Sequence, residues 1–95
     1  MRAVQWSDRA IRDMDAIEAY WMSRDPSMVS DLASAAKQSL DFLSATPGAG
    51  APLEQSGLRK WRVGRTPFLF FYRFDRQFVR VIRVRHERED WRRTR

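Results

Sequence analysis

The residues best suited to chemistry are the arginines interleaved with aromatic and aliphatic side chains in the last third of the chain, and the sole histidine, which ends that run. Guanidinium and ammonium groups bind phosphate or carboxylate oxygens, and an imidazole can exchange a proton near neutral pH. Together these groups can hold a phosphate and move a proton beside it. Six residues are therefore candidate contacts to a target or to nucleic acid: Arg59, Lys60, Arg62, Arg73, Arg83 and His86.

Most of these cations are expected in β-strands. Residues 68–74 and 78–86 are rich in aromatic and β-branched residues, and three polar residues separate them, which predicts a β-hairpin. Burial of arginine stems over apolar surface and protection of a strand edge are the alternative explanations for any single arginine. Strict alternation along 78–86 gives two faces that each mix cations with aliphatic residues: Arg83 and Arg85 with Val79 and Val81, and Arg80 and His86 with Ile82 and Val84.

The positive charge of the chain is concentrated in its second half. The 95 residues carry a net charge of +6. Residues 1–48 hold five Lys or Arg against seven Asp or Glu, a net of −2, whereas residues 49–95 hold thirteen against five, a net of +8. This balance favours an acidic partner, which can be nucleic acid, an acidic protein or an anionic membrane surface. The cationic function is expected in the C-terminal half.

Length and composition predict one domain over residues 1–95, with 43% hydrophobic residues to fill one modest core. The absence of cysteine excludes a disulfide scaffold and a thiolate metal site, and it suits a reducing compartment. The longest apolar run, residues 68–72, is far shorter than the roughly 20 residues that span a bilayer, and no signal-peptide segment is evident. We expect a cytoplasmic protein that uses no membrane, metal or cofactor.

The first half of the chain predicts a strand followed by two helices. Residues 3–6 suit a short strand, and Ser7 can cap a helix that ends near Ser23. Asp25-Pro26 then starts a second helix, which Pro47-Gly48 stops. Each helix has one apolar stripe at helical spacing, and both stripes are expected to be core: Ile11, Met14, Ile17 and Trp21 in the first, and Val29, Leu32, Ala36, Leu40 and Leu43 in the second.

The second half predicts three consecutive strands. After a loop over 46–52, residues 57–63 alternate as a strand, residues 64–67 form a turn, and the hairpin follows. Three strands joined by short turns form an antiparallel meander. We therefore predict an α+β fold with the order β-α-α-β-β-β, in which a helix hairpin packs on one face of an antiparallel sheet. The opposite face stays partly open and displays Arg and Lys.

The order and spacing of several short segments carry a resemblance to a known family. These segments are Val4-Gln-Trp-Ser before a helix with Ala10, Asp13 and Ile17, the Pro47-Gly48 loop, the Gly57-Leu-Arg strand, the Phe71-Tyr72-Arg73 strand, and the ending Ile82-Arg83-Val84-Arg85-His86. Over nearly its whole length the chain resembles the RelE/ParE superfamily of bacterial toxin–antitoxin toxins. The resemblance implies the same α+β topology that the residues predict by themselves.

This superfamily combines two activities with one fold, so the fold cannot decide the function. The RelE-like branch cleaves messenger RNA in the ribosomal A site by attack of a 2′-hydroxyl. That reaction needs a proton acceptor, a proton donor and cations on the phosphate. The ParE-like branch is a binding inhibitor that traps DNA gyrase on cleaved DNA.

The resemblance favours the ParE-like branch because a proton-transfer pair is incomplete. RelE-like nucleases generally place a tyrosine or a His/Tyr pair just beyond the last strand, where this chain has Glu-Arg-Glu-Asp-Trp at 87–91. The two tyrosines are Tyr20, expected in the first helix, and Tyr72, in the hairpin. Asp90 and Trp91 fit the approximate ParE-like ending His-x-x-Arg-Asp-Trp, while glutamate at position 89 departs from it.

We therefore expect a ParE-like toxin that has no catalytic residue, inhibits DNA gyrase, and is neutralised by a cognate antitoxin whose acidic, disordered tail folds on binding. The alternative is a RelE-like endoribonuclease acting on the ribosome with its messenger RNA, with His86, Arg83 and Arg62 as catalytic residues. Otherwise His86 is expected to be a strand-end imidazole bonded to the tail. A plain nucleic-acid-binding domain is a third, disfavoured hypothesis, because stacking needs exposed rings. The phenylalanines of the first hairpin strand are instead needed in the core: Phe68, Phe70, Phe71 and Phe74.

Overall fold

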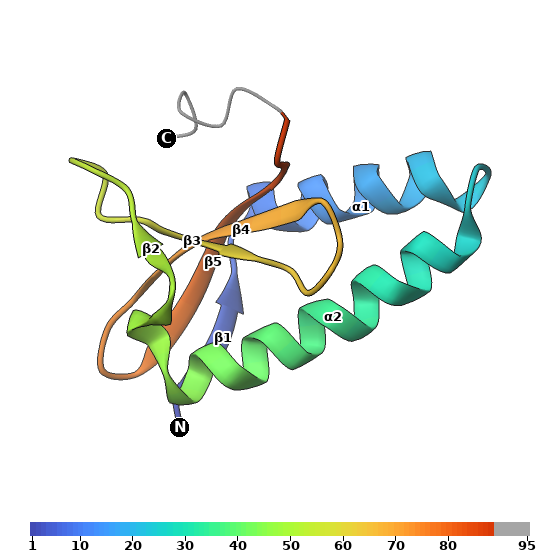
Figure 1. Cartoon of the computed structure of the whole chain (residues 1–95). Coiled ribbons are helices and arrows are strands. Elements are labelled where there is room, and N and C mark those ends of the chain that lie inside the picture. Colours follow the sequence, from blue (N-terminus) through green and yellow to red (C-terminus); the bar gives the residue numbers. More distant parts are fainter. Residues whose placement is uncertain (89–95) are drawn as a thin grey trace.

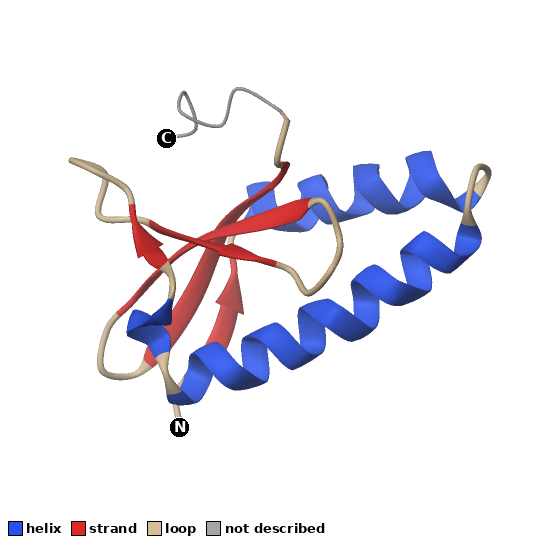
Figure 2. Ribbon diagram, in the orientation of Figure 1, coloured by secondary structure: helices blue, strands red, loops and turns tan. Residues whose placement is uncertain are grey.

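Two helices cover one face of a five-stranded sheet (Figures 1 and 2). The computed structural model describes residues 1–88. The elements in chain order are β1 (Ala3–Trp6), α1 (Asp8–Met22), α2 (Pro26–Ala45), the 3₁₀ turn η1 (Pro47–Ala49), β2 (Ala51–Pro52), β3 (Arg59–Arg62), β4 (Phe68–Phe74) and β5 (Phe78–His86). This arrangement confirms the predicted single α+β domain, with a helix hairpin on one face of the sheet.

The sheet is mixed rather than wholly antiparallel. Its strand order is β1-β5-β4-β3-β2. The predicted meander is confirmed, because β3, β4 and β5 pair antiparallel in sequence order. β1, in contrast, pairs parallel with β5, in a register that sets Ala3 opposite Phe78 and Trp6 opposite Val81. A parallel pair needs a long connection between its strands, and the helix hairpin and the other strands supply it here.

The strand before the hairpin is shorter than predicted, and a further short strand lies beside it. β3 begins at Arg59 rather than at residue 57. Gly57 has a φ of 73°, a left-handed conformation that does not belong to a strand. Ala51 and Pro52, in the predicted loop, form β2 and pair with β3. A proline is tolerated there because β2 is an edge strand.

Both helices begin and end close to their predicted residues. The Ser7 hydroxyl accepts a hydrogen bond from the Ala10 N–H at 3.0 Å, as expected of an N-cap, and donates to the Ile82 carbonyl at 2.7 Å. These two bonds fix the start of α1 beside β5. α2 starts at Pro26 as predicted, but the Asp25 side chain makes no capping bond to the backbone. Figure 1 shows the far end of the helix hairpin extending beyond the strands.

The core lies between the helices and the sheet. Its main cluster joins both helices to the sheet: Ala10, Leu32, Ala36, Leu40, Val63, Phe68, Phe70, Val81 and Val84. Leu43, Tyr72 and Val79 form a second cluster. The expected burial of the hairpin phenylalanines is confirmed at Phe68, Phe70 and Phe71, which are not available as stacking platforms, and it is wrong for Phe74, which is 39% exposed.

A β-bulge at Ile82 changes which residues of β5 share a face. Tyr72 pairs with Val81 and Phe71 pairs with Arg83, so Ile82 has no partner on β4 and the alternation restarts there. The expected mixture of cations and aliphatic residues on each face is therefore wrong. The valines of β5 lie under the helices, where they are almost fully buried, and the pairing register places the arginines on the opposite face: Val79, Val81 and Val84 against Arg80, Arg83 and Arg85.

No helix within residues 1–88 combines the length and the apolar character needed to cross a bilayer. The longest helix, α2, has 20 residues but includes Asp31, Lys37 and Asp41. The same part of the chain contains no group of three or more His, Cys, Asp or Glu side chains placed to hold a metal ion.

Candidate anion-binding face of the sheet

The sheet face opposite the helices carries three rows of side chains that run across the strands. Residues paired on neighbouring strands project to the same face. The pairing gives the rows Arg62, Leu69 and Arg85; Lys60, Phe71 and Arg83; and Arg73 and Arg80, with Gln5 beside Arg80. We call these rows the outer sheet face. They agree with the expected display of Arg and Lys, and successive rows along β4 lie roughly 7 Å apart.

Arg83 belongs to the middle row, but its guanidinium is bound to α1. Its Nε and Nη2 donate to the two carboxylate oxygens of Asp13 at 2.8 and 3.2 Å. The Val84 N–H donates to the same carboxylate at 2.9 Å. Asp13 thus occupies the edge of β5 beyond the last residue of β1 and accepts a backbone hydrogen bond that a longer β1 strand would otherwise take. Because Arg83 is only 9% exposed, its geometry favours a structural role.

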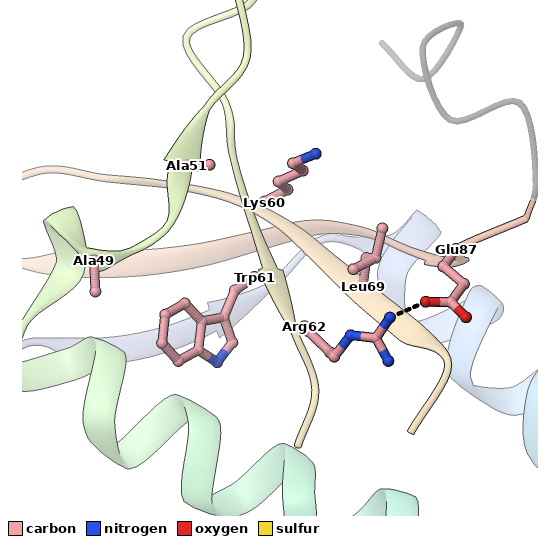
Figure 3. A pocket seen from close by; sticks show the side chains of 7 residues that line it. All are labelled: Ala49, Ala51, Lys60, Trp61, Arg62, Leu69 and Glu87. Atoms are coloured by element: carbon pink, nitrogen blue, oxygen red, sulfur yellow. Dashed lines mark hydrogen bonds and ion pairs between the residues drawn. The ribbon is translucent and has the colours of Figure 1, made fainter. Parts of the chain in front are cut away.

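Arg62 is held by a carboxylate at the other side of the sheet. Its Nη2 forms an ion pair with Glu87, and its Nη1 donates to the Thr66 carbonyl at 3.2 Å. Figure 3 shows this pair at the rim of an open hollow beside β3. The hollow has a volume of about 460 Å³ and is lined by Ala49, Ala51, Lys60, Trp61, Arg62, Leu69 and Glu87. A partner that uses the charge of Arg62 must therefore compete with Glu87.

Arg59 and Tyr72 fix the loop that leads from α2 into the strands. The Tyr72 hydroxyl donates to the Pro47 carbonyl at 2.7 Å and accepts from the Gly50 N–H at 2.9 Å. Arg59 Nη1 donates to the carbonyls of Gly48 and Gly50 at 3.1 and 2.8 Å. Burial raises the pKa of Tyr72, although the Gly50 N–H and the nearby Arg59 act in the opposite direction. Tyr72 is fully buried and cannot serve a bound substrate.

His86 lies on the helix side of the sheet. It pairs with Phe68, whose ring it meets edge to face at a centroid distance of 5.5 Å. Its Nδ1 accepts a hydrogen bond from the Arg88 N–H at 3.0 Å. This contact agrees with the expectation of a strand-end imidazole bonded to the residues that follow. His86 also lines a second open hollow of about 380 Å³ together with Tyr20 and Trp21 of α1.

The structure therefore divides the six candidate residues into two groups. Lys60, Arg62, Arg73 and Arg83 share the outer sheet face, whereas Arg59 and His86 lie on the helix side. Sequence reasoning left out Arg80 and Arg85, which strict alternation puts on opposite faces and the bulge puts on the same one. Residues 78–86 form a continuous β-pattern, and nothing in their composition marks Ile82 as the extra residue of a bulge. The residues compared with the ParE-like ending, Glu89, Asp90 and Trp91, lie outside the described residues.

The Arg73 and Arg80 guanidiniums form no ion pair with an acid of the described chain. The two residues are directly opposite each other on β4 and β5. Arg73 is exposed, while the Nε atom of Arg80 is buried and has no hydrogen-bond partner. Asp75, two residues beyond Arg73, is already engaged, because its carboxylate accepts the N–H groups of Gln77 and Phe78 at 2.7 and 2.8 Å.

Comparisons with known proteins agree over almost the whole chain. Residues 4–91 match the model of a family described as the ParE toxin of the type II toxin–antitoxin system parDE. The protein named "Putative toxin Y4kP" of Sinorhizobium fredii is 27% identical over 90 residues, which cover 95% of this chain and 93% of that protein. A structure of the chromosomal ParDE system from P. aeruginosa superposes with a TM-score of 0.75 and 25% identity, covering 90% of this chain and 96% of that one. The RelBE2 toxin–antitoxin complex from Mycobacterium tuberculosis has the same fold, with a TM-score of 0.63, 24% identity and the same coverage.

Proposed function

Since the chain belongs to the ParE toxin family of type II toxin–antitoxin systems, we propose that it inhibits DNA gyrase and is neutralised by binding a cognate antitoxin. It acts on gyrase as a binding inhibitor that stabilises the cleaved-DNA complex and makes no chemical attack of its own. On the outer sheet face it has cations to hold an anionic surface, and no residue of that face acts as a catalytic acid or base.

The observation that carries this proposal is the separation of cations from proton-transfer groups. His86 projects to the helix side, away from the outer-face cations, and Tyr72 is fully buried. The Glu87 carboxylate is bound to Arg62 at the edge of the outer sheet face and would repel a phosphate placed there. Cleavage of RNA needs an acid and a base within hydrogen-bond reach of the same phosphate. A cation cluster without them is suited to binding.

Ribosome-dependent cleavage of messenger RNA is the second candidate, and one observation favours it. His86 and Tyr20 line the same hollow, and the Arg24 guanidinium lies 3.8 Å from the centre of the Tyr20 ring. A histidine, a tyrosine and an arginine are residue types that such a reaction can use. We rank this function second because Arg24 is stacked on the ring and the cations of the outer sheet face lie on the other side of the sheet.

The antitoxin is expected to use the helix side as well as the basic charge. Large exposed apolar residues gather on the two helices and suit the apolar face of a segment that folds on binding: Ile11, Tyr20, Met22 and Phe42. The excess of basic residues in the second half of the chain suits acidic residues in the same segment. A small DNA-binding protein with an acidic, amphipathic C-terminus in the adjacent reading frame fits this description.

Purified toxin mixed with DNA gyrase and supercoiled plasmid tests the target. The expected result is linear plasmid, released when the trapped complex is denatured, and loss of supercoiling activity, while messenger RNA on programmed ribosomes stays intact. Expressing cells should filament and accumulate double-strand breaks. Codon-positioned cleavage of the messenger, with gyrase unaffected at the same toxin concentration, refutes the proposal and selects the second function.

A His86→Gln variant separates the two functions within the toxin itself. The amide can replace one hydrogen bond of the imidazole but cannot act as a general acid or base near neutral pH. Gyrase inhibition should therefore persist, and Tyr20→Phe, which removes only the hydroxyl of the other polar residue in the hollow, should behave alike. A folded His86→Gln protein whose toxicity has dropped by two or more orders of magnitude would support the ribonuclease.

A further inference from the structure

Arg73 and Arg80 form a cross-strand pair of like charges that no group of residues 1–88 compensates. They occupy directly opposite positions on β4 and β5, and opposite pairs have their Cβ atoms only about 5 Å apart. Like charges at this separation destabilise a sheet. Neither guanidinium has a hydrogen bond or an ion pair with any residue of 1–88. The described part of the chain therefore maintains a repulsive pair for which its own contacts offer no compensation.

The buried Nε of Arg80 is a second group of this pair that lacks a partner in the described chain. This atom is shielded from solvent and lacks an acceptor, although a buried charged donor without a partner is costly. An oxygen-rich anion seated between the two guanidiniums would accept from Arg80 and would turn the repulsion into a shared attraction. A guanidinium presents its donors in a planar fork that matches two oxygens of one phosphate or carboxylate. The site is therefore suited to an oxyanion.

The neighbouring rows extend the site into a strip. The next rows along β4 contribute Lys60 and then Arg62 and Arg85, at steps of roughly 7 Å. Acidic residues do not interrupt the strip between the Arg73 row and the Arg62–Glu87 pair in the described chain. Regularly repeated cations along one line are suited to a polymer with regularly repeated charge.

The distribution of exposed apolar residues favours nucleic acid over an acidic peptide as the molecule bound by the outer sheet face. A peptide that folds on binding needs an apolar surface to bury, as in helix-in-groove recognition. None of the large exposed hydrophobic residues in the described chain belongs to the outer-face rows: Met1, Val4, Ile11, Tyr20, Met22, Phe42 and Phe74. The apolar members of the rows are Phe71, which is fully buried, and Leu69, which is partly buried, so the outer sheet face offers mainly cations. A phosphodiester backbone needs only the cations.

We propose that the outer sheet face binds the phosphodiester backbone of nucleic acid, with Arg73 and Arg80 holding one phosphate between them and the row of Lys60 receiving a neighbouring one. The toxin then contacts nucleic acid directly, in addition to its protein target. This binding does not depend on the identity of the inhibited enzyme, because it rests on the charges of the sheet alone.

The test is fluorescence anisotropy with the purified toxin and two labelled probes, a 20-base-pair DNA duplex and a single-stranded RNA of equal length, between about 50 and 200 mM salt. Each lost phosphate contact lowers the magnitude of the log Kd against log salt slope by about 0.9 for duplex DNA and about 0.7 for a single strand. The double variant Arg73→Gln/Arg80→Gln loses the one phosphate that the pair holds, so it should lose about 0.9 in duplex slope and bind the duplex about 8-fold more weakly near 0.1 M salt. The probe that binds more tightly identifies the type of nucleic acid.

The matched control is Arg9→Gln/Arg12→Gln, which removes the same charge from exposed positions of α1. It should keep the slope, and its affinity should fall only slightly. If the two double variants lost equal affinity for the probes, binding would depend on net charge alone and the proposed site would be refuted. The proposal would also be overturned if Arg73→Gln/Arg80→Gln bound DNA and RNA as tightly as the parent protein does but no longer bound a glutamate-rich peptide. If the double variant does not fold, Arg73→Gln alone decides, with an expected loss of at most about 8-fold because Arg80 still faces the same phosphate.

Discussion

Replacing Asp13 by alanine should destabilise the protein by about 3 kcal/mol. The carboxylate accepts three hydrogen bonds, two from the Arg83 guanidinium at 2.8 and 3.2 Å and one from the Val84 N–H at 2.9 Å. Breaking a fully buried ion pair from one side costs about 3–5 kcal/mol. The side chains of Asp13 and Arg83 are 18% and 11% exposed, so water can reach the abandoned groups and the lower end of that range applies.

Urea unfolding monitored by circular dichroism measures this loss. With a slope of about 1–3 kcal/mol per molar urea, the midpoint should fall by roughly 1–3 M. Asp15→Ala, an exposed acidic position on the same helix, is the control and should leave the midpoint almost unchanged. Adding Arg83→Met to the Asp13→Ala protein should recover much of the stability, because it removes the buried cation that has lost its partner.

The recovered double variant also decides the role of Arg83. If the arginine is structural, the Asp13→Ala/Arg83→Met protein should remain toxic, because both members of a purely internal pair are gone. A stable double variant without toxicity would show that Arg83 contacts the target. An Asp13→Ala midpoint indistinguishable from the parent would refute the energetic reasoning itself.

Three further predictions concern the loop, the hairpin and the antitoxin. Tyr72→Phe should lower stability by about 1–3 kcal/mol and speed amide exchange at Gly50, because that N–H and the Pro47 carbonyl lose their partner; unchanged exchange would contradict this role. The N–H groups of Gln77 and Phe78 lower the pKa of Asp75. Its carboxylate therefore stabilises the fold above the ordinary carboxyl pKa, and this stabilisation is lost as the pH falls through the lowered value. The melting temperature should depend less on pH between about pH 5 and pH 2 for Asp75→Asn than for the parent protein. Raising salt from about 50 to 500 mM should slow antitoxin association more than it speeds dissociation, and a salt-independent association rate would leave apolar burial as the explanation.

The fold was predictable because local signals along the chain agree with one another. Ser7 does cap α1, and the hairpin phenylalanines at 68, 70 and 71 are buried as their spacing indicates. The second helix stripe is buried from Leu32 to Leu43, but in the first stripe Met14, Ile17 and Trp21 are only partly buried and the prediction is wrong for Ile11, which is 47% exposed. The parallel addition of β1 was not predictable from these signals, since pairing direction depends on contacts between segments distant in sequence. β2 was missed for a related reason, because a two-residue strand has no periodicity of its own.

The candidate site was less predictable than the fold, because charge alone does not reveal which partner a side chain has. Arg59, Arg62 and Arg83 read equally well as free cations, yet each is engaged, by loop carbonyls, by Glu87 and by Asp13. The loop carbonyls lie 9 and 11 residues from Arg59 along the chain, Glu87 lies 25 from Arg62, and Asp13 lies 70 from Arg83. Arg80 was omitted because its place on the outer face depends on one extra residue in β5.

That extra residue at position 82 also determines how this strand can vary. The two parts of β5 on either side of Ile82 alternate in opposite phase, so adding or deleting one residue there would exchange the buried and solvent-facing sets of one part. Substitutions that keep the length are far less constrained on the solvent-facing side, because Arg80 and Arg85 can change without altering the packing of Val79, Val81 and Val84. Recognition by this face can therefore diverge among relatives while the interior stays the same. For the solvent-facing residues of β5 to vary in this way, the length of the strand must stay the same, whereas no single cation on it has to.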